Sequence, residues 1–121
     1  MSEKVLLVDD ELDFLEAMSE RMTARGMEVT TASSAKKAIE IIEKISFDAI
    51  ILDFQMPEMD GMEALQTIKA KRPESQIILL TGYATLEKGV EAMKIGATDF
   101  IEKPADLEAL ADKIKKAKAE R

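Results

Sequence analysis

The feature that most constrains the fold is a fivefold alternation of short apolar runs with longer segments of helical periodicity. Each run is rich in aliphatic residues and bounded by polar or turn-forming residues, which predicts a β-strand. The runs are Val5–Val8, Met27–Thr31, Ala49–Leu52, Ile77–Leu80 and Thr98–Ile101. The second run alternates apolar and polar residues, so we expect it at an edge of the sheet.

The segments between the runs carry apolar residues at the spacing of one helix face, which predicts five helices. In the fourth helix the expected core residues are Leu86, Val90 and Met93. Residues typical of helix ends flank these segments, with Gly26 and Gly96 as C-terminal ends and Ser33, Asp60 and Asp106 as N-caps. Five strand-then-helix units predict an α/β fold with a five-stranded parallel sheet between two helix layers. The expected strand order is 2-1-3-4-5.

Length and composition limit the functions that such a fold could perform. A chain of 121 residues has the usual size of one domain, so we expect residues 1–121 to form one unit. The absence of cysteine and histidine excludes thiolate metal sites and removes the usual general base. Asp and Glu number 24 against 17 Lys and Arg, which argues against binding nucleic acid or an anionic membrane. With no long apolar stretch and no signal-peptide pattern, the expected location is cytoplasmic.

Polar residues follow four of the predicted strands at their carboxyl ends. Asp9 and Asp10 follow the first strand, Asp53 the third, Thr81 the fourth and Lys103 the fifth. Strands one and three are expected neighbours, so the three aspartates should meet at one edge of the sheet. Two carboxylates about 4 Å apart repel by roughly 1 to 4 kcal/mol, and a cation would relieve this repulsion. Oxygen ligands without imidazole or thiolate best match Mg²⁺, which usually serves a phosphoryl group.

These markers, with Met56-Pro57-Glu58-Met59-Asp60-Gly61 after Asp53, Gly82 after Thr81 and Pro104 after Lys103, resemble the CheY-like receiver domain of two-component response regulators. The resemblance covers nearly the whole chain and implies a flavodoxin-like (βα)5 fold. It implies a phosphorylation-controlled signalling switch in a phosphorelay, in which Asp53 accepts a phosphoryl group. Such a domain is not an enzyme, although it promotes its own Mg²⁺-dependent phosphorylation and dephosphorylation.

The resemblance also implies the ligands of the metal and of the phosphoryl group. Asp10, Asp53 and the backbone carbonyl of Gln55 would bind Mg²⁺, and Asp9 would act through a metal-bound water. Thr81 would donate a hydrogen bond to the phosphoryl group, and Lys103 would pair with its charge.

Further positions match residues that aim or tune the site in this family. The bond before Pro104 is usually cis and directs the preceding lysine into the site. Phe100 matches an aromatic residue that turns inward when Thr81 moves toward the phosphoryl group. Gln55 and Tyr83 depart from the commonest family pattern, and we expect them to tune the lifetime of the phosphoryl group.

The partners follow from the same resemblance. Because the chain has no histidine, the phosphohistidine donor would be a sensor histidine kinase or a histidine phosphotransfer protein. The output would pass through the face of the fourth helix, fifth strand and fifth helix to a downstream protein or domain, or to a phosphorylation-dependent homodimer. Whether the chain is a stand-alone receiver or a domain of a longer protein is left open.

Two other classes of function can be compared with this one. The alternative is a protein-interaction module that uses the receiver fold without phosphorylation. An enzyme on this fold fits less well, because an FMN binder would need a glycine- and hydroxyl-rich phosphate loop where Asp9-Asp10-Glu11 stands. A phosphatase of the haloacid dehalogenase type would carry Asp-x-Asp there.

Overall fold

A parallel sheet of five strands forms the middle layer of the computed structural model, which describes residues 2–53, 55–56, 59–81, 86–102 and 106–119. The strands are β1 (Lys4–Val8), β2 (Glu28–Ala32), β3 (Ala49–Asp53), β6 (Ile77–Thr81) and β7 (Asp99–Glu102). Their order is β2-β1-β3-β6-β7, with β2 at an edge. The predicted order is therefore confirmed, with β6 and β7 as the fourth and fifth expected strands. Two-residue strands β4 (Gln55–Met56) and β5 (Met59–Asp60) pair as a separate antiparallel ladder.

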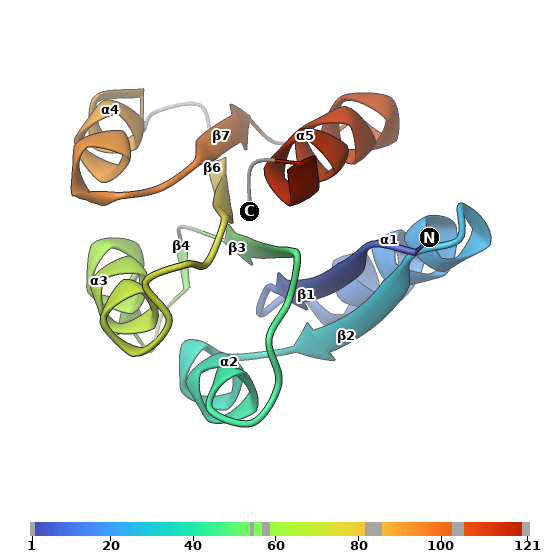
Figure 1. The fold of residues 1–121 in the computed structure, drawn as a ribbon, viewed down its shortest axis with the longest axis horizontal. Coiled ribbons are helices and arrows are strands. Elements are labelled where there is room, and N and C mark those ends of the chain that lie inside the picture. The colour runs from blue at the N-terminus through green and yellow to red at the C-terminus, as the bar shows by residue number, and fades with distance from the viewer. Residues whose placement is uncertain (1, 54, 57–58, 82–85, 103–105, 120–121) are drawn as a thin grey trace.

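Five helices cover the two faces of the sheet. They are α1 (Leu12–Ala24), α2 (Ala35–Ile42), α3 (Gly61–Lys71), α4 (Leu86–Ile95) and α5 (Leu107–Ala119). Figure 1 shows α1 and α5 on one side of the sheet and α2, α3 and α4 on the other, which is the expected three-layer sandwich. Among the described residues, none of the helices has both the length and the apolar character to cross a membrane.

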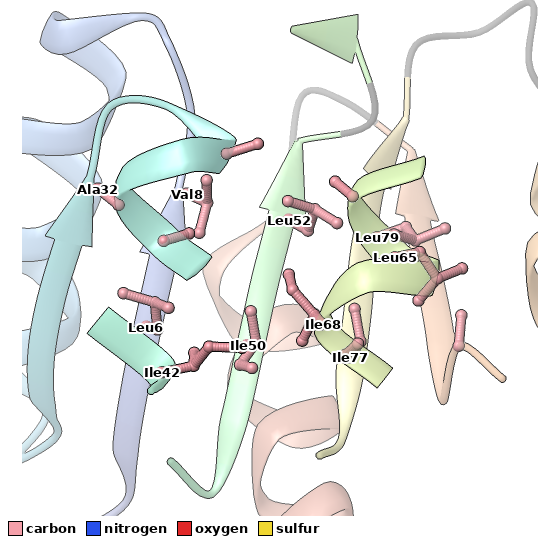
Figure 2. Packing of buried hydrophobic residues seen from close by; sticks show 14 of the residues in the cluster. Leu6, Val8, Ala32, Ile42, Ile50, Leu52, Leu65, Ile68, Ile77 and Leu79 are labelled. Carbon is pink, nitrogen blue, oxygen red and sulfur yellow. The ribbon is translucent and has the colours of Figure 1, made fainter. Parts of the chain in front are cut away.

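The central strands are buried on both faces, and this burial holds the sheet in place. On β3 all five residues are buried, and successive side chains alternate between the two helix layers. Ile50 and Leu52 pack with Leu6 and Leu65 on the side of α2 and α3 (Figure 2). Ile51 packs on the side of α1 and α5. The last residue of this apolar strand is Asp53, so a buried carboxylate lies at the carboxyl end of the central strand.

The helix ends agree with the sequence prediction at three positions and correct it at one. Asp106 accepts a hydrogen bond from the Ala109 N–H at 3.4 Å, and Gly26 and Gly96 have φ angles of +92° and +135°. The prediction of Ser33 as an N-cap is wrong, because Ser34 Oγ accepts the hydrogen bond from Lys37 N–H at 3.1 Å. Strand β2 continues to Ala32, one residue beyond the predicted run, so the helix begins correspondingly later.

Helix α4 presents a different face to the core from the one that was expected. Val90 and Met93 are 47% and 39% exposed, so the prediction that they are core residues is wrong. Ala92 is fully buried in their place, and Ile95 packs against the same cluster. Both lines of residues have helical spacing and apolar character, so periodicity alone could not distinguish them. The small side chain of Ala92 is accommodated in the core, and the larger Val90 and Met93 lie on the outer surface.

Candidate functional site

Three carboxylates meet at the carboxyl edge of the sheet, as the sequence predicts. Asp9 directly follows β1, and Asp53 ends the adjacent β3, one residue after the pair Val8 and Leu52. Asp9, Asp10 and Asp53 each offer an oxygen within 4.8 Å of the others. Asp9 is fully buried and Asp53 is 3% exposed, whereas Asp10 is more accessible. The parallel register of β1 and β3 is what brings these side chains together.

Asp9 is held in place by backbone hydrogen bonds on two sides. Its N–H donates to the carbonyl oxygen of Ala32 at 3.1 Å, which continues the ladder between β1 and β2. Its Oδ1 accepts a hydrogen bond from the N–H of Glu11 at 2.9 Å. Glu11 is the N-cap of α1, and its carbonyl oxygen accepts the N–H of Leu15 at 3.0 Å. The Asp9 carboxylate therefore joins the end of a strand to the start of a helix.

From the sequence alone, a cap or turn role for Asp9 was weighed and set aside, because three aspartates expected to meet at one place favoured a cation site. The signal was present, since aspartate commonly accepts a hydrogen bond from the backbone two residues later. The structure shows that Asp9 has both features, because it closes the turn with the Glu11 N–H and also lies in the carboxylate cluster.

The chemistry of the cluster favours a hard divalent cation. Three carboxylates at this separation repel one another, and the repulsion is larger for buried groups than for groups in water. Oxygen atoms are the donors that Mg²⁺ prefers, and this chain has no cysteine or histidine that would favour a softer metal. The donor set therefore fits Mg²⁺.

The remaining residues expected at the site are only partly described. Thr81 is the last residue of β6 and pairs with Glu102, so its backbone lies one register position beyond the Asp53–Leu80 pair. Gln55 begins β4, two residues after Asp53. Lys103, Pro104 and Tyr83 lie outside the described residues, so their predicted roles remain predictions.

Phe100 lies in β7, at the end of the sheet covered by α4. It pairs with Leu79 of β6, is partly buried, and packs against the cluster that contains Ala92. Its neighbour Asp99 extends toward the opposite layer and forms an ion pair with Lys113 of α5 at 2.8 Å. Phe100 thus faces the core layer that includes Ala92 of α4, and Asp99 links the same short edge strand to α5.

Comparison with known proteins gives a consistent result across nearly the whole chain. Residues 5–115 match the family model of the response regulator receiver domain. Response regulator protein FleR of Pseudomonas aeruginosa is 36% identical over 114 residues, which are 94% of this chain and 24% of FleR. Transcriptional regulatory protein ZraR of Escherichia coli is 35% identical over 115 residues, which are 95% of this chain and 26% of ZraR. The chain thus spans about a quarter of the length of these relatives.

Solved structures agree with this result. The crystal structure of a response regulator receiver domain protein from Clostridium thermocellum has a TM-score of 0.93 and 34% identity, covering 98% of this chain and 95% of that one. The receiver domain of NtrX from Brucella abortus has a TM-score of 0.91 and 30% identity, covering 97% of this chain and 99% of that one.

Proposed function

Because this chain belongs to the family of response regulator receiver domains, we propose that it is a switch controlled by phosphorylation of Asp53. The family consists of signalling domains of two-component systems and is not a classical enzyme family. We also propose that residues 1–121 together form one receiver domain. The observation that carries it is the position of Asp53, a nearly buried carboxylate within 4.8 Å of Asp9 and Asp10.

The chemical step is a transfer of one phosphoryl group. An oxygen of the Asp53 carboxylate attacks the phosphorus of a phosphohistidine on a partner protein. The O–P bond forms as the P–N bond breaks, the imidazole keeps the electron pair, and Asp53 becomes an acyl phosphate. Because this chain has no histidine, the donor must be another molecule, which we propose is a sensor histidine kinase or a histidine phosphotransfer protein.

The residues around Asp53 would make this transfer favourable. Asp10, Asp53 and the carbonyl of Gln55 would hold Mg²⁺, which receiver domains generally bind, with Asp9 nearby. The ion would supply positive charge against the carboxylates and the incoming phosphoryl oxygens. Thr81 would donate a hydrogen bond to a phosphoryl oxygen, and Lys103 would neutralise part of its charge.

The output would pass through α4, β7 and α5. Phosphorylation gives Asp53 additional charge and three acceptor oxygens, so Thr81 would gain an acceptor that exists only in the phosphorylated protein. A contact made in only one state shifts the population of conformations toward that state. Phe100 packs against the core layer beside α4, where a change in its position would alter that helix. The receiving surface would belong to an output domain or protein, since the relatives are response regulators much longer than this chain.

The proposal is tested by adding acetyl phosphate and Mg²⁺ and measuring intact mass. Wild type should gain the mass of one phosphoryl group, and Asp53→Asn should gain none, because the amide cannot act as the nucleophile. Asp48→Asn is the matched control, since Asp48 lies at the opposite edge of the sheet before β3, and it should be labelled like wild type. Equal labelling of wild type and Asp53→Asn would contradict the proposal and favour an interaction module that works without phosphorylation.

The lifetime of the phosphoryl group gives a second test. Gln55 and Tyr83 occupy positions two residues after the phosphoacceptor and two after Thr81, where side chains would shield or admit water. We expect Gln55→Ala and Tyr83→Ala to change the dephosphorylation rate measured after removal of the phosphodonor. Glu40→Ala, an exposed change on α2, is the control and should keep the wild-type rate. Unchanged rates in both site variants would remove these residues from the proposed tuning role.

A further inference from the structure

A short turn carries Asp10, and the side chain of Asp9 closes it. The bond from Glu11 N–H to Asp9 Oδ1 is 2.9 Å long and spans two residues, so the residue enclosed by it is Asp10. Asp9 is fully buried and its own N–H is bonded to Ala32 at 3.1 Å, so the accepting oxygen is presented from a fixed backbone. A turn closed by a buried, anchored acceptor restricts the backbone angles of the residue within it.

The other end of the turn is equally well fixed. Glu11 has φ −85° and ψ +103°, the extended conformation of an N-cap, and its carbonyl accepts the Leu15 N–H. Helix α1 is held by its buried face, which includes Leu15, Met18 and Met22. Asp10 therefore lies between a fixed strand and a fixed helix, and the Asp9–Glu11 hydrogen bond links the two directly.

We infer that Asp9 is a positioning residue for Asp10, acting as a hydrogen-bond acceptor in addition to contributing negative charge. The accepting oxygen fixes the turn that places a carboxylate oxygen of Asp10 within 4.8 Å of Asp53. The consequence for the metal rests on the proposed function, whereas the effect on the turn does not. The two contributions of Asp9 are separable, because asparagine keeps an acceptor oxygen and loses the charge, while alanine loses both.

The experiment compares wild type, Asp9→Asn and Asp9→Ala by amide hydrogen exchange and by Mg²⁺ titration, both followed by NMR. Without metal, exchange of the Glu11 amide should stay within about twofold of wild type in Asp9→Asn and rise about tenfold in Asp9→Ala. With metal, both variants should bind Mg²⁺ more weakly than wild type, and Asp9→Ala should bind about tenfold more weakly than Asp9→Asn. Asp9→Ser, whose hydroxyl is a weaker acceptor, should fall between them and replaces Asp9→Ala if that variant does not fold.

Asp48 provides a matched control at the opposite edge. Its Oδ2 accepts the Lys4 N–H at 2.8 Å, in a backbone-to-carboxylate bond far from the cluster. Asp48→Asn removes the charge there, and Asp48→Ala removes both the charge and the acceptor. Asp48→Ala should raise exchange of the Lys4 amide, and neither Asp48 variant should change Mg²⁺ affinity.

The outcomes separate this inference from the function on which it partly rests. Equal Mg²⁺ affinities in Asp9→Asn and Asp9→Ala would show that only the charge matters and would overturn the inference. Unchanged Glu11 exchange in Asp9→Ala would overturn it as well. A wild-type protein that binds no Mg²⁺ would overturn the proposed function, while Glu11 exchange would still decide whether Asp9 shapes the turn.

Discussion

Each edge of the sheet has an aspartate that accepts a backbone hydrogen bond, but the charges around the two aspartates differ. Asp9 at the carboxyl edge and Asp48 at the amino edge each accept a backbone N–H, at 2.9 and 2.8 Å. Asp48 also lies 3.7 Å from the ammonium group of Lys118, which offsets its charge. Asp9 instead lies against two further carboxylates within 4.8 Å. At the amino edge the aspartate lies beside a cation, and at the carboxyl edge three carboxylates lie close enough together to bind one.

The amino edge also contains a set of mutually satisfied polar groups. The hydroxyl of Thr98 accepts the Ile77 N–H at 3.1 Å and donates to Gln76 Oε1 at 2.9 Å. Lys69 Nζ donates to the Ser75 carbonyl at 2.6 Å and closes the turn after α3. The difference teaches that the amino edge pairs its aspartate with an ammonium group, whereas the carboxyl edge brings three carboxylates close together. Substitutions at the two edges should therefore differ in sign and in their dependence on metal.

The largest expected effect is stabilisation by magnesium. At a concentration one hundred times its Kd, Mg²⁺ should raise the free energy of unfolding of wild type by about 2.7 kcal/mol, because it binds the folded state. Urea denaturation with and without Mg²⁺ measures this, and Asp10→Asn should gain less at the same concentration. NaCl of equal ionic strength is the control for screening. An equal gain from NaCl would mean that the carboxyl edge holds no specific cation.

The next effect lies at the amino edge. Thr98→Val should lower the free energy of unfolding by about 2 kcal/mol, because the buried Ile77 N–H loses its bond to the Thr98 hydroxyl and Gln76 loses a donor. The stabilisation by Mg²⁺ should be unchanged. Thr67→Val is the control, since the Thr67 hydroxyl donates to the Glu63 carbonyl within the same helix, and it should change stability by less than about 0.5 kcal/mol. Similar losses in both variants would show that the hydrogen bonds of Thr98 contribute no more to stability than the helical hydrogen bond of Thr67.

The smallest effect tests whether the charges around Asp10 and Asp48 raise or lower the free energy of unfolding. Without divalent cations, Asp10→Asn should raise the free energy of unfolding by about 1 kcal/mol, because it removes repulsion from Asp9 and Asp53. Asp48→Asn should lower it, because Asp48 loses its attraction to Lys118. Parallel urea titrations at low salt measure both. A loss of stability in Asp10→Asn would show that the cluster is already compensated in the protein alone.

The sheet order and the carboxylate cluster were predictable because both follow from strong, repeated signals. The apolar strands must lie inside, parallel connections have one hand, and residues after adjacent parallel strands share an edge. Asp9, Asp10 and Asp53 therefore had to approach one another once the strands were identified. The roles proposed for Thr81, Lys103, Pro104 and Tyr83, and the cytoplasmic location, stay predictions.

Two predictions were wrong where the local sequence offered two alternatives of similar chemistry and spacing. Ser33 and Ser34 are equally good N-caps by chemistry, and the end of β2 selected the second. Helix α4 offered two apolar lines, and packing against the sheet selected the one with Ala92. Neither choice is encoded in the periodicity of the segment itself.

The sequence by itself determined which five segments form the main sheet, their order in it and the edge at which the acids gather, because hydrophobic burial and chain connectivity leave few arrangements. Only the tertiary structure decided what those acids contact. The bond from Asp9 to Glu11 and the pair of Asp48 with Lys118 depend on distances of a few ångströms between separately folded elements. Hydrogen bonds and charge interactions change steeply over such distances, so they are fixed only when the packed core has set the positions of the strands and helices.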